Sequence, residues 1–260
     1  MFAHETKIIS NIRITSDTCL IALRYPEIVS QAWPGQFVML RVGAGIDPLL
    51  RRPFSICGVK DDLFFILYKV VGRGTAMMTG LKENDAMSVI GPLGKGFDLP
   101  EKDCRHVFVA GGIGIAPLIF LAQVVKDKDI RFLAGFASAS EIITPDRVLD
   151  LDINVSIATD DGTQGHSGFV TELMKTETQE KSLKSVFACG PMVMLKKVTD
   201  LTNEAGIECQ VSLESEMACG IGVCQGCAVR KLPAGKQPSY FHICKDGPVF
   251  PGQAIDWGSV

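Results

Sequence analysis

The segment from 217 to 229, MACGIGVCQGCAV, constrains the fold of this chain more than any other stretch. Three of the nine cysteines, Cys219, Cys224 and Cys227, lie within nine residues, and Cys244 follows seventeen residues after the third. The spacing is therefore C-x4-C-x2-C-x16-C. Sulfurs gathered in this way are typical of a small unit that folds around bound metal.

The spacing of the first three cysteines matches that of plant-type 2Fe–2S proteins. Gly220, Gly222 and Gly226 would let the backbone curl around a cluster and bring amide N–H groups close to its sulfurs. Zinc is the alternative, since four thiolates also suit Zn²⁺, but zinc sites usually pair two C-x2-C knuckles and this segment has one. We predict that the cluster ligands are Cys219, Cys224, Cys227 and Cys244.

Composition sets outer bounds on the rest of the chain. At 260 residues, nearly half of them hydrophobic, it is long enough for two or three domains with a sizeable core. A net charge of −3 argues against a nucleic-acid or anionic-membrane surface. With no signal-peptide pattern and no membrane-length apolar run, we expect a cytoplasmic protein. In that reducing compartment the scattered cysteines are expected to be buried thiols: Cys19, Cys57, Cys104, Cys189 and Cys209.

The middle of the chain carries a glycine turn, HVFVAGGIGIAPLIFLAQVV. A short apolar run from 106 to 110 precedes it, and helical density from 115 to 125 follows. A strand, a glycine turn and a helix N-terminus form a site for a pyrophosphate. The spacing is G-x-G-x-x-P, from Gly112, Gly114 and Pro117, and tight packing between strand and helix explains it equally well.

Further strand-like runs follow at 130–136, 153–162, 185–195 and 208–213, with helical material clearest at 191–205. This alternation predicts a doubly wound parallel sheet, whose ligands bind beyond the carboxyl ends of the strands. ATDDG and ACGP stand at such ends. Asp160 and Asp161 can also be read as turn residues, and Cys189 as a buried thiol.

The first hundred residues have a different texture, with short alternating segments separated by Gly, Pro and Asp. They predict a small antiparallel barrel. Within it, RRPFSI places Arg52 at a strand start, and VVGRGTAMM places Gly74 and Thr75 at a helix start. Both features suit a phosphate, although a surface arginine and ordinary capping remain the alternatives. We expect a mixed β and α/β fold with domains at 1–100, 101–210 and 211–260.

RPFS, GRGT, GGIGIAPL and ACGP, in this order, resemble the ferredoxin-NADP reductase superfamily, which joins an FAD-binding barrel to a nicotinamide-binding α/β domain. With LESEMACGIGVCQGC and CKDGPVF at the C-terminal end, the whole chain resembles the electron-transfer subunits of B-type dihydroorotate dehydrogenases. Two departures stand out. Phe54 stands where many members of the superfamily have Tyr, and the cluster segment takes the place of the usual C-terminal aromatic residue that shields the flavin.

The resemblance implies roles for particular residues. Arg52 would bind the FAD pyrophosphate, Ser55 would hydrogen-bond near flavin N5, and Gly74 and Thr75 would cap the pyrophosphate. The flavin set is Arg52, Pro53, Phe54, Ser55, Leu67, Tyr68, Lys69, Gly74 and Thr75. The nicotinamide dinucleotide set is Gly112, Gly114, Pro117, Asp160, Cys189, Gly190 and Pro191. No catalytic side chain is expected, because hydride transfer to a flavin needs no general base.

The resemblance also implies a route for electrons. NADH would reduce FAD, the 2Fe–2S cluster would take the electrons singly, and a separate dihydroorotate dehydrogenase catalytic subunit carrying FMN would receive them. This is a step of pyrimidine biosynthesis, in a heterotetramer with two copies of each chain. The alternatives are a small subunit of an NAD(P)H:ferredoxin-type oxidoreductase or sulfide dehydrogenase, and a non-enzymatic zinc or iron–sulfur module.

The sequence favours NADH over NADPH, because a 2′-phosphate needs a cationic partner near the adenosine ribose. GFASASEII at 135–143 has no Lys or Arg and contains Glu141, and ATDDG at 158–162 offers Asp160 and Asp161. Arg147 is the one residue that would reverse this expectation, if its loop folds back toward that pocket.

Overall fold

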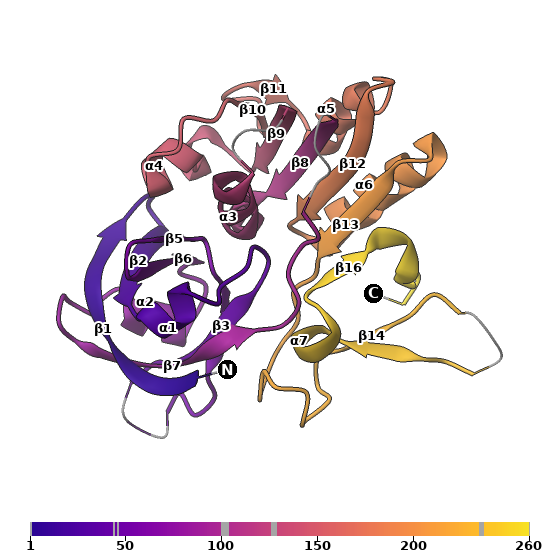
Figure 1. Cartoon of the computed structure of the whole chain (residues 1–260). Coiled ribbons are helices and arrows are strands. Elements are labelled where there is room, and N and C mark those ends of the chain that lie inside the picture. The colour runs from indigo at the N-terminus through magenta and orange to yellow at the C-terminus, as the bar shows by residue number, and fades with distance from the viewer. Residues whose placement is uncertain are drawn as a thin grey trace.

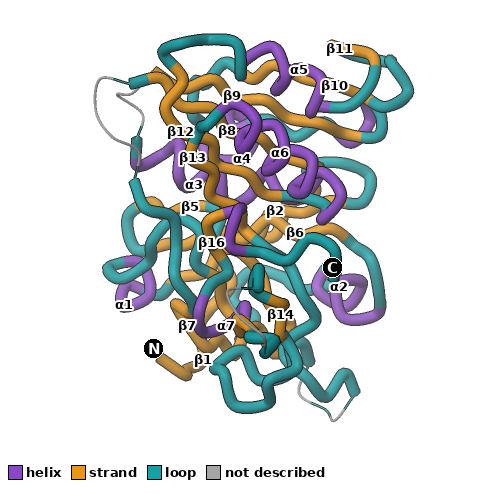
Figure 2. Tube along the Cα trace, turned by 90° about the vertical axis from the view of Figure 1, so that its right-hand side faces the viewer, coloured by secondary structure: helices purple, strands orange, loops and turns teal. Residues whose placement is uncertain are grey.

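The computed structural model describes residues 2–43, 45, 47–99, 104–125, 129–233 and 237–259. Figure 1 shows a curled sheet built from the N-terminal part, an α/β sheet above it, and a C-terminal segment beside both. Figure 2, turned by 90°, shows strands β8 to β13 stacked above the N-terminal sheet. The mixed β and α/β fold is thus as predicted.

Antiparallel pairing joins all neighbours in the N-terminal sheet, whose strand order is β4-β3-β7-β1-β2-β6-β5. Only Ile56 and Cys57 separate the two edge strands along the chain, so the sheet curls into the predicted barrel. Its strands are β1 Phe2–Arg13, β2 Thr18–Arg24, β3 Phe37–Arg41, β4 Arg52–Ser55, β5 Gly58–Lys60, β6 Leu63–Lys69 and β7 Ala86–Leu93.

The second sheet has the order β11-β10-β9-β8-β12-β13-β16 and is parallel except at the β13–β16 pair. Its strands are β8 Arg105–Gly111, β9 Asp129–Phe136, β10 Val155–Thr159, β11 His166–Ser167, β12 Leu183–Cys189, β13 Glu208–Ser212 and β16 Val249–Pro251. Along β8, Phe108 and Ala110 pack in one hydrophobic cluster, while Val107 and Val109 pack in another. Both faces are therefore covered, as in a doubly wound sheet.

Helices lie on both faces of this sheet and at the barrel ends. In the described residues they are α1 Pro26–Val29, α2 Arg73–Met78, α3 Ile115–Val124, α4 Pro145–Leu149, α5 Val170–Glu177, α6 Met192–Ala205 and α7 Ile243–Asp246, with short 3₁₀ turns η1 Gly112–Gly114, η2 Ala139–Glu141 and η3 Gly252–Ala254. The predicted helices at 115–125 and 191–205 correspond to α3 and α6. None of the helices in the described ranges has the length and apolar character needed to cross a membrane.

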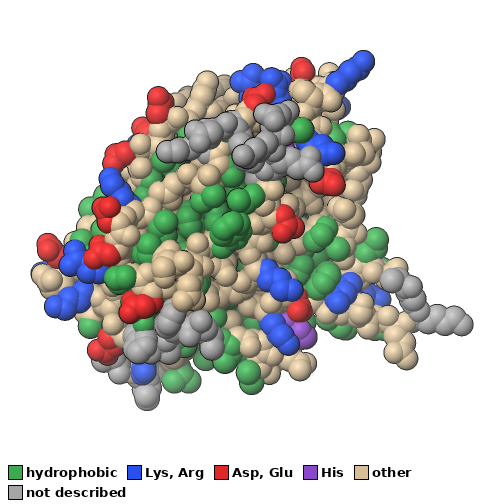
Figure 3. All heavy atoms as spheres, viewed as in Figure 1, with side chains coloured by type: hydrophobic (Ala, Val, Ile, Leu, Met, Phe, Trp, Pro, Cys, Tyr) green, Lys and Arg blue, Asp and Glu red, His purple; other side chains and the backbone are tan. Residues whose placement is uncertain are grey.

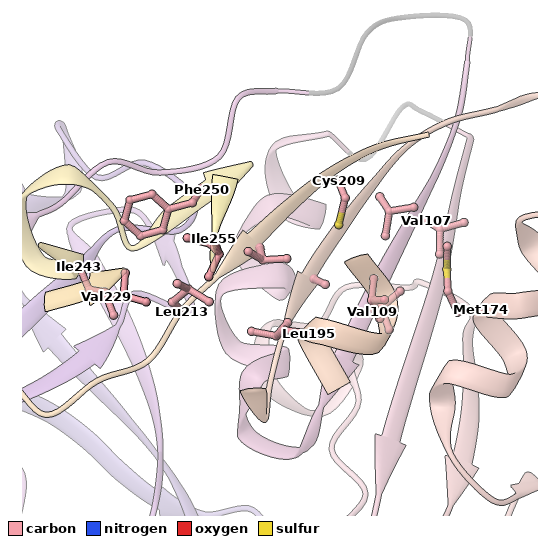
Figure 4. Packing of buried hydrophobic residues seen from close by; sticks show 14 of the residues in the cluster. Val107, Val109, Met174, Leu195, Cys209, Leu213, Val229, Ile243, Phe250 and Ile255 are labelled. Atoms are coloured by element: carbon pink, nitrogen blue, oxygen red, sulfur yellow. The ribbon is translucent and has the colours of Figure 1, made fainter. Parts of the chain in front are cut away.

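The C-terminal segment adds the hairpin of β14 Ala228–Arg230 and β15 Tyr240–His242, then α7 and β16. Because β16 pairs with β13, the last fifty residues extend the α/β sheet as well as carrying the cysteines. Figure 4 shows one hydrophobic cluster running from Val107 in the sheet to Ile243 in α7. The three-domain division stays a prediction, and its boundary at 100/101 lies outside the described residues.

Charge is mixed on the visible surface. On the face drawn in Figure 3, basic and acidic side chains are interspersed around the rim, and hydrophobic ones gather in the middle, over the α3 region of Figure 1. This mixture agrees with the mild net charge of −3.

Candidate functional site

A cavity of about 340 Å³ lies where the barrel, the glycine turn and the C-terminal segment meet. The barrel contributes β4 and the end of β6, the α/β sheet contributes η1 and α3, and the segment after β13 closes the remaining side. The lining residues are Phe37, Arg52, Pro53, Phe54, Ser55, Leu67, Tyr68, Lys69, Val71, Thr75, Ile113, Ala116, Ser212, Leu213, Glu214, Ser215, Met217 and Pro248. The residues of the predicted flavin set thus line one cavity, except Gly74, which lies beside it.

Arg52 and the start of α2 form the polar end of this cavity. A Cβ placed on Gly74 would lie 2.9 Å from Arg52 Nε, so glycine lets the guanidinium and the helix backbone meet. The Thr75 hydroxyl accepts hydrogen bonds from the N–H groups of Val71 and Gly72, at 3.0 and 3.2 Å, and so fixes the turn. A guanidinium beside a helix N-terminus fits a pyrophosphate.

The apolar wall comes from β4 and β6. Phe54 packs edge-on against Tyr68, with ring centroids 6.2 Å apart. Tyr68 itself is almost fully buried, and its hydroxyl donates to Asn11 Oδ1 at 3.0 Å. Tyr68 is therefore anchored in the barrel core, and Phe54, Leu67 and Tyr68 together form the wall that a flat ring system would contact.

Lys69 lies at the cavity edge but is already paired. Its Nζ lies 2.8 Å from Glu141 Oε2 and 3.1 Å from Asp17 Oδ2. The hydrogen bond to Glu141 and then that to Asp17, which act against desolvation, raise the pKa of Lys69. Because Glu141 belongs to η2, this ion pair joins the barrel to the α/β sheet. The two carboxylates also neutralise the positive charge of Lys69, which would otherwise attract a phosphate.

The glycine turn after β8 packs directly on the turn after β12. A Cβ on Gly114 would lie 2.4 Å from the Cys189 carbonyl oxygen, and one on Gly190 would lie 2.9 Å from Gly111 Cα. Tight packing, the alternative explanation of the glycine turn, therefore accounts for Gly114, and the same packing accounts for Gly190. Gly112 is different, since it has φ +52° and a Cβ there would meet nothing within 4 Å. A dinucleotide backbone has room to approach at Gly112.

The remaining residues of the dinucleotide set lie around these turns. Pro117 is buried in the first turn of α3, and Pro191 follows Gly190 at the start of α6. Cys189 is buried, and burial, followed by the charge of Glu214, raises the pKa of its thiol. The backbone of Cys189, the last residue of β12, meets the glycine turn.

The two segments predicted to lie near the adenosine, 135–143 and 158–162, are side by side at the carboxyl ends of β9 and β10. The Asp160 N–H donates to the Phe136 carbonyl at 3.0 Å, and the Asp161 N–H donates to Ala137. Asp161 also accepts a hydrogen bond from the Thr163 hydroxyl, which lowers the pKa of this carboxyl. Asp160 is two strands away from the glycine turn, roughly 10 Å across the sheet.

Arg147 does not turn toward these carboxylates. Its guanidinium donates to the carbonyl oxygens of Ile142 and Ile14, so it braces the α4 region against the barrel. The Arg147 loop therefore does not fold back toward the adenosine pocket, which was the condition for Arg147 to favour NADPH.

Glu214 is a lining residue that the sequence reasoning missed. It lies two residues after the end of β13 and lines the cavity, where desolvation raises the pKa of its carboxyl. The signal was present, because Glu214 stands after a predicted strand in the same way as Asp160. Its neighbours, LESEMACG, were instead read only as the approach to the cysteines.

The four cysteines lie in two pairs. Cys227 Sγ and Cys244 Sγ are 3.2 Å apart and almost fully buried. Cys219 and Cys224 form the other pair, on the exposed side of the loop, with the Cys224 side chain hydrogen-bonded to Cys219. A two-iron cluster held by four thiolates needs two sulfurs for each iron, and this pairing meets that need.

Backbone N–H groups point at these sulfurs. Gly222 donates to Cys244 Sγ at 3.1 Å, and Cys224 and Ile221 donate to Cys219 Sγ at 3.4 and 3.5 Å. Although desolvation raises it, these N–H groups lower the pKa of Cys219 to about 6, which favours the thiolate that binds metal. Burial and then the Cys227 thiol raise the pKa of Cys244 to about 12.

The same geometry bears on zinc. Among the described residues, no three His, Cys, Asp or Glu side chains converge closely enough to hold one metal ion together. Four thiolates suit a single tetrahedral Zn²⁺ as well as a two-iron cluster, which takes two sulfurs for each iron.

Comparison with known proteins places these features in a context. The family described as the iron–sulfur cluster binding domain of dihydroorotate dehydrogenase B matches residues 214–256. The electron transfer subunit of dihydroorotate dehydrogenase B (NAD(+)) from Desulforamulus reducens is 37% identical over 257 residues, covering 97% of this chain and 98% of that protein. The subunit of the same name from Caldanaerobacter subterraneus is 36% identical over 95% of each chain.

Solved structures share the fold. An NADH-dependent reduced ferredoxin-NADP oxidoreductase, studied for flavin-based electron bifurcation, superimposes with a TM-score of 0.83 and 29% identity, over 97% of this chain and 90% of that one. A ferredoxin NADP+ reductase from Neisseria gonorrhoeae, with bound FAD and NADP, gives 0.66 at 20% identity, over 78% of this chain and 92% of that one. The second likeness concerns the fold alone.

Proposed function

Because the chain belongs to the family of dihydroorotate dehydrogenase B electron transfer subunits, we propose that it passes electrons from NADH, through FAD and a 2Fe–2S cluster, to a separate catalytic subunit. One observation carries the proposal. One cavity is lined by residues of the barrel, by Ile113 of the glycine turn and by Met217. Met217 lies two residues before Cys219, the first of the four predicted cluster ligands. A flavin in that cavity would face both an electron donor and an electron exit.

The chain's own residues prepare this path. Arg52 and the start of α2 would hold the pyrophosphate, and Phe54 and Leu67 would bound the ring system and exclude water. Gly112 leaves room for the dinucleotide beside Ile113, which lines the cavity. A bound flavin supplies the conversion between a two-electron hydride and single electrons, which neither a nicotinamide nor an iron–sulfur cluster can make alone.

The finer proposal concerns the partner. We infer an FMN-containing dihydroorotate dehydrogenase catalytic subunit, assembled with this chain as a heterotetramer with two copies of each. The test is reconstitution: the purified chain is mixed with such a subunit, and NADH-dependent reduction of orotate is followed. We expect activity that needs both chains and a complex of the combined mass in size-exclusion chromatography. Absence of any complex and of coupled activity would overturn this partner.

A second candidate keeps the same cofactors but changes the acceptor. The likeness to the NADH-dependent reduced ferredoxin-NADP oxidoreductase, at 29% identity over most of both chains, favours a small subunit of a ferredoxin-type oxidoreductase. Replacing the catalytic subunit by ferredoxin in the same assay distinguishes the two. Faster reduction of ferredoxin would favour the second candidate.

We also expect NADH to reduce the flavin in preference to NADPH. Asp160 and Asp161 lie at the adenosine edge, while Glu141 is paired with Lys69 and Arg147 is engaged elsewhere. Placing a phosphate dianion among carboxylates costs enough to lower the second-order rate constant by about tenfold or more. Stopped-flow reduction with each cofactor measures this ratio, and a larger constant for NADPH would refute the acidic pocket.

A further inference from the structure

The loop that carries Cys219 and Cys224 rests on the barrel through one close contact. Gly220 is buried, and its φ of +71° is the left-handed conformation that favours glycine. A Cβ there would lie 2.5 Å from Met39 Cγ and 2.9 Å from Met39 Sδ. Met39 is fully buried on β3, so it cannot easily move aside. No side chain fits at 220 unless the loop or the strand shifts.

The same strand forms part of the cavity wall. Phe37, two residues before Met39 on the same face of β3, lines the cavity, and Met39 is paired across the sheet with Pro53, which also lines it. Met217 lines the cavity and lies two residues before Cys219. Strand β3 and the 217–220 segment therefore connect the flavin cavity directly to the cysteine loop.

The hydrophobic packing around the contact between Gly220 and Met39 is continuous. Phe37 and Met39 belong to the same hydrophobic cluster as the buried ligands Cys227 and Cys244, and Met217 packs against that cluster. Both cysteine pairs are thus held relative to the barrel, the buried pair through this core and the exposed pair through Gly220.

We propose that the contact between Met39 and Gly220 sets the distance between the flavin cavity and the cysteine loop, which makes Gly220 a positioning residue for electron transfer out of the flavin. The inference rests on the proposed function. In the step concerned, a reduced flavin loses one electron, an oxidised cluster gains it, and no bond of the protein forms or breaks. The rate of such a transfer falls steeply with the distance between the flavin and the cluster. Displacing the loop from Met39 would therefore slow the transfer.

Gly206 provides a matched control outside the cysteine loop. It also has a positive φ, +66°, but a Cβ there would meet nothing within 4 Å. Gly220→Ala and Gly206→Ala therefore share the backbone strain, and only Gly220→Ala pushes against the barrel. A third variant, Gly220→Ala with Met39→Ala, removes the atoms that the new methyl group would meet.

The variants are purified without oxygen, their FAD and iron contents are measured, and the cluster is followed by stopped-flow absorbance after NADH has reduced the flavin. We expect Gly220→Ala to slow cluster reduction by roughly tenfold or more relative to Gly206→Ala, since small misplacements carry large rate penalties. Flavin reduction by NADH is expected to be unchanged, and Met39→Ala is expected to restore most of the lost rate.

Equal rates in the two glycine variants, or no rescue by Met39→Ala, would overturn the inference. If the Gly220→Ala variant loses its iron, iron content replaces the rate as the readout. The double variant is then expected to bind iron again. A double variant without iron would count against the role of the contact between Met39 and Gly220. A wild-type chain that takes up neither FAD nor iron would instead overturn the proposed function, so the two failures are distinguishable.

Discussion

Replacing Cys227 by serine is expected to abolish electron delivery to an acceptor protein while leaving the flavin fully reducible by NADH. Cys227 is almost completely buried, with its sulfur 3.2 Å from that of Cys244, so it belongs to the inner pair of the cluster. A serine oxygen is a hard ligand that replaces a soft thiolate poorly. Iron content should fall to background, and the flavin cavity, which Cys227 does not line, should stay intact.

Cys209→Ser is the control for this change. Cys209 is as buried as Cys227 and lies in the same hydrophobic cluster, but it is on β13 and is not a predicted ligand. It should keep its iron and its electron delivery. Retention of the full complement of iron by Cys227→Ser would contradict its assignment as a ligand. Loss of flavin reduction while FAD remains bound would contradict the order of electron flow.

Arg52→Ala is expected to weaken FAD binding by roughly tenfold to a hundredfold. A charge-assisted contact to a pyrophosphate contributes about 1.5–3 kcal/mol. Arg52 lines the cavity and lies against Gly74 at the start of α2, where the phosphates are expected. FAD affinity is measured by fluorescence titration of the chain after the flavin has been removed. Iron content should not change, because the cysteines lie outside this end of the cavity.

Arg131→Ala is the matched control for charge. Arg131 is exposed on β9 and does not line the cavity, so its loss changes the net charge equally without touching the site. If both variants bind FAD as the wild-type chain does, Arg52 has no part in holding the pyrophosphate.

Local sequence patterns predicted the barrel and the doubly wound sheet well, and the four cysteines that they single out lie close together in two pairs. These features depend on residues close together in the chain: alternation along β6, the glycine turn before α3, and sulfurs in one loop. The resemblance to the ferredoxin-NADP reductase superfamily collected Arg52, Phe54 and Leu67 into one set, and the structure brings these residues to one cavity.

What sequence reasoning missed depends on contacts between distant segments. Lys69 does line the cavity, but sequence reasoning did not foresee that Asp17 and Glu141, far away in the chain, pair with its charge. Glu214 enters the cavity only because β13 ends beside the barrel. The pairing of β16 with β13 likewise follows from how the segment after the cysteines folds back onto the sheet, which no local pattern records.

Anaerobic titration of the purified wild-type chain with NADH tests the central claim most directly, combined with analysis of FAD, iron, zinc and acid-labile sulfide on the same sample. The account predicts one FAD and two irons per chain, matching sulfide and negligible zinc. NADH should then bleach the flavin and reduce the cluster without any other protein present. Stoichiometric zinc without sulfide, or a flavin that NADH reduces while the cluster stays oxidised, would contradict it.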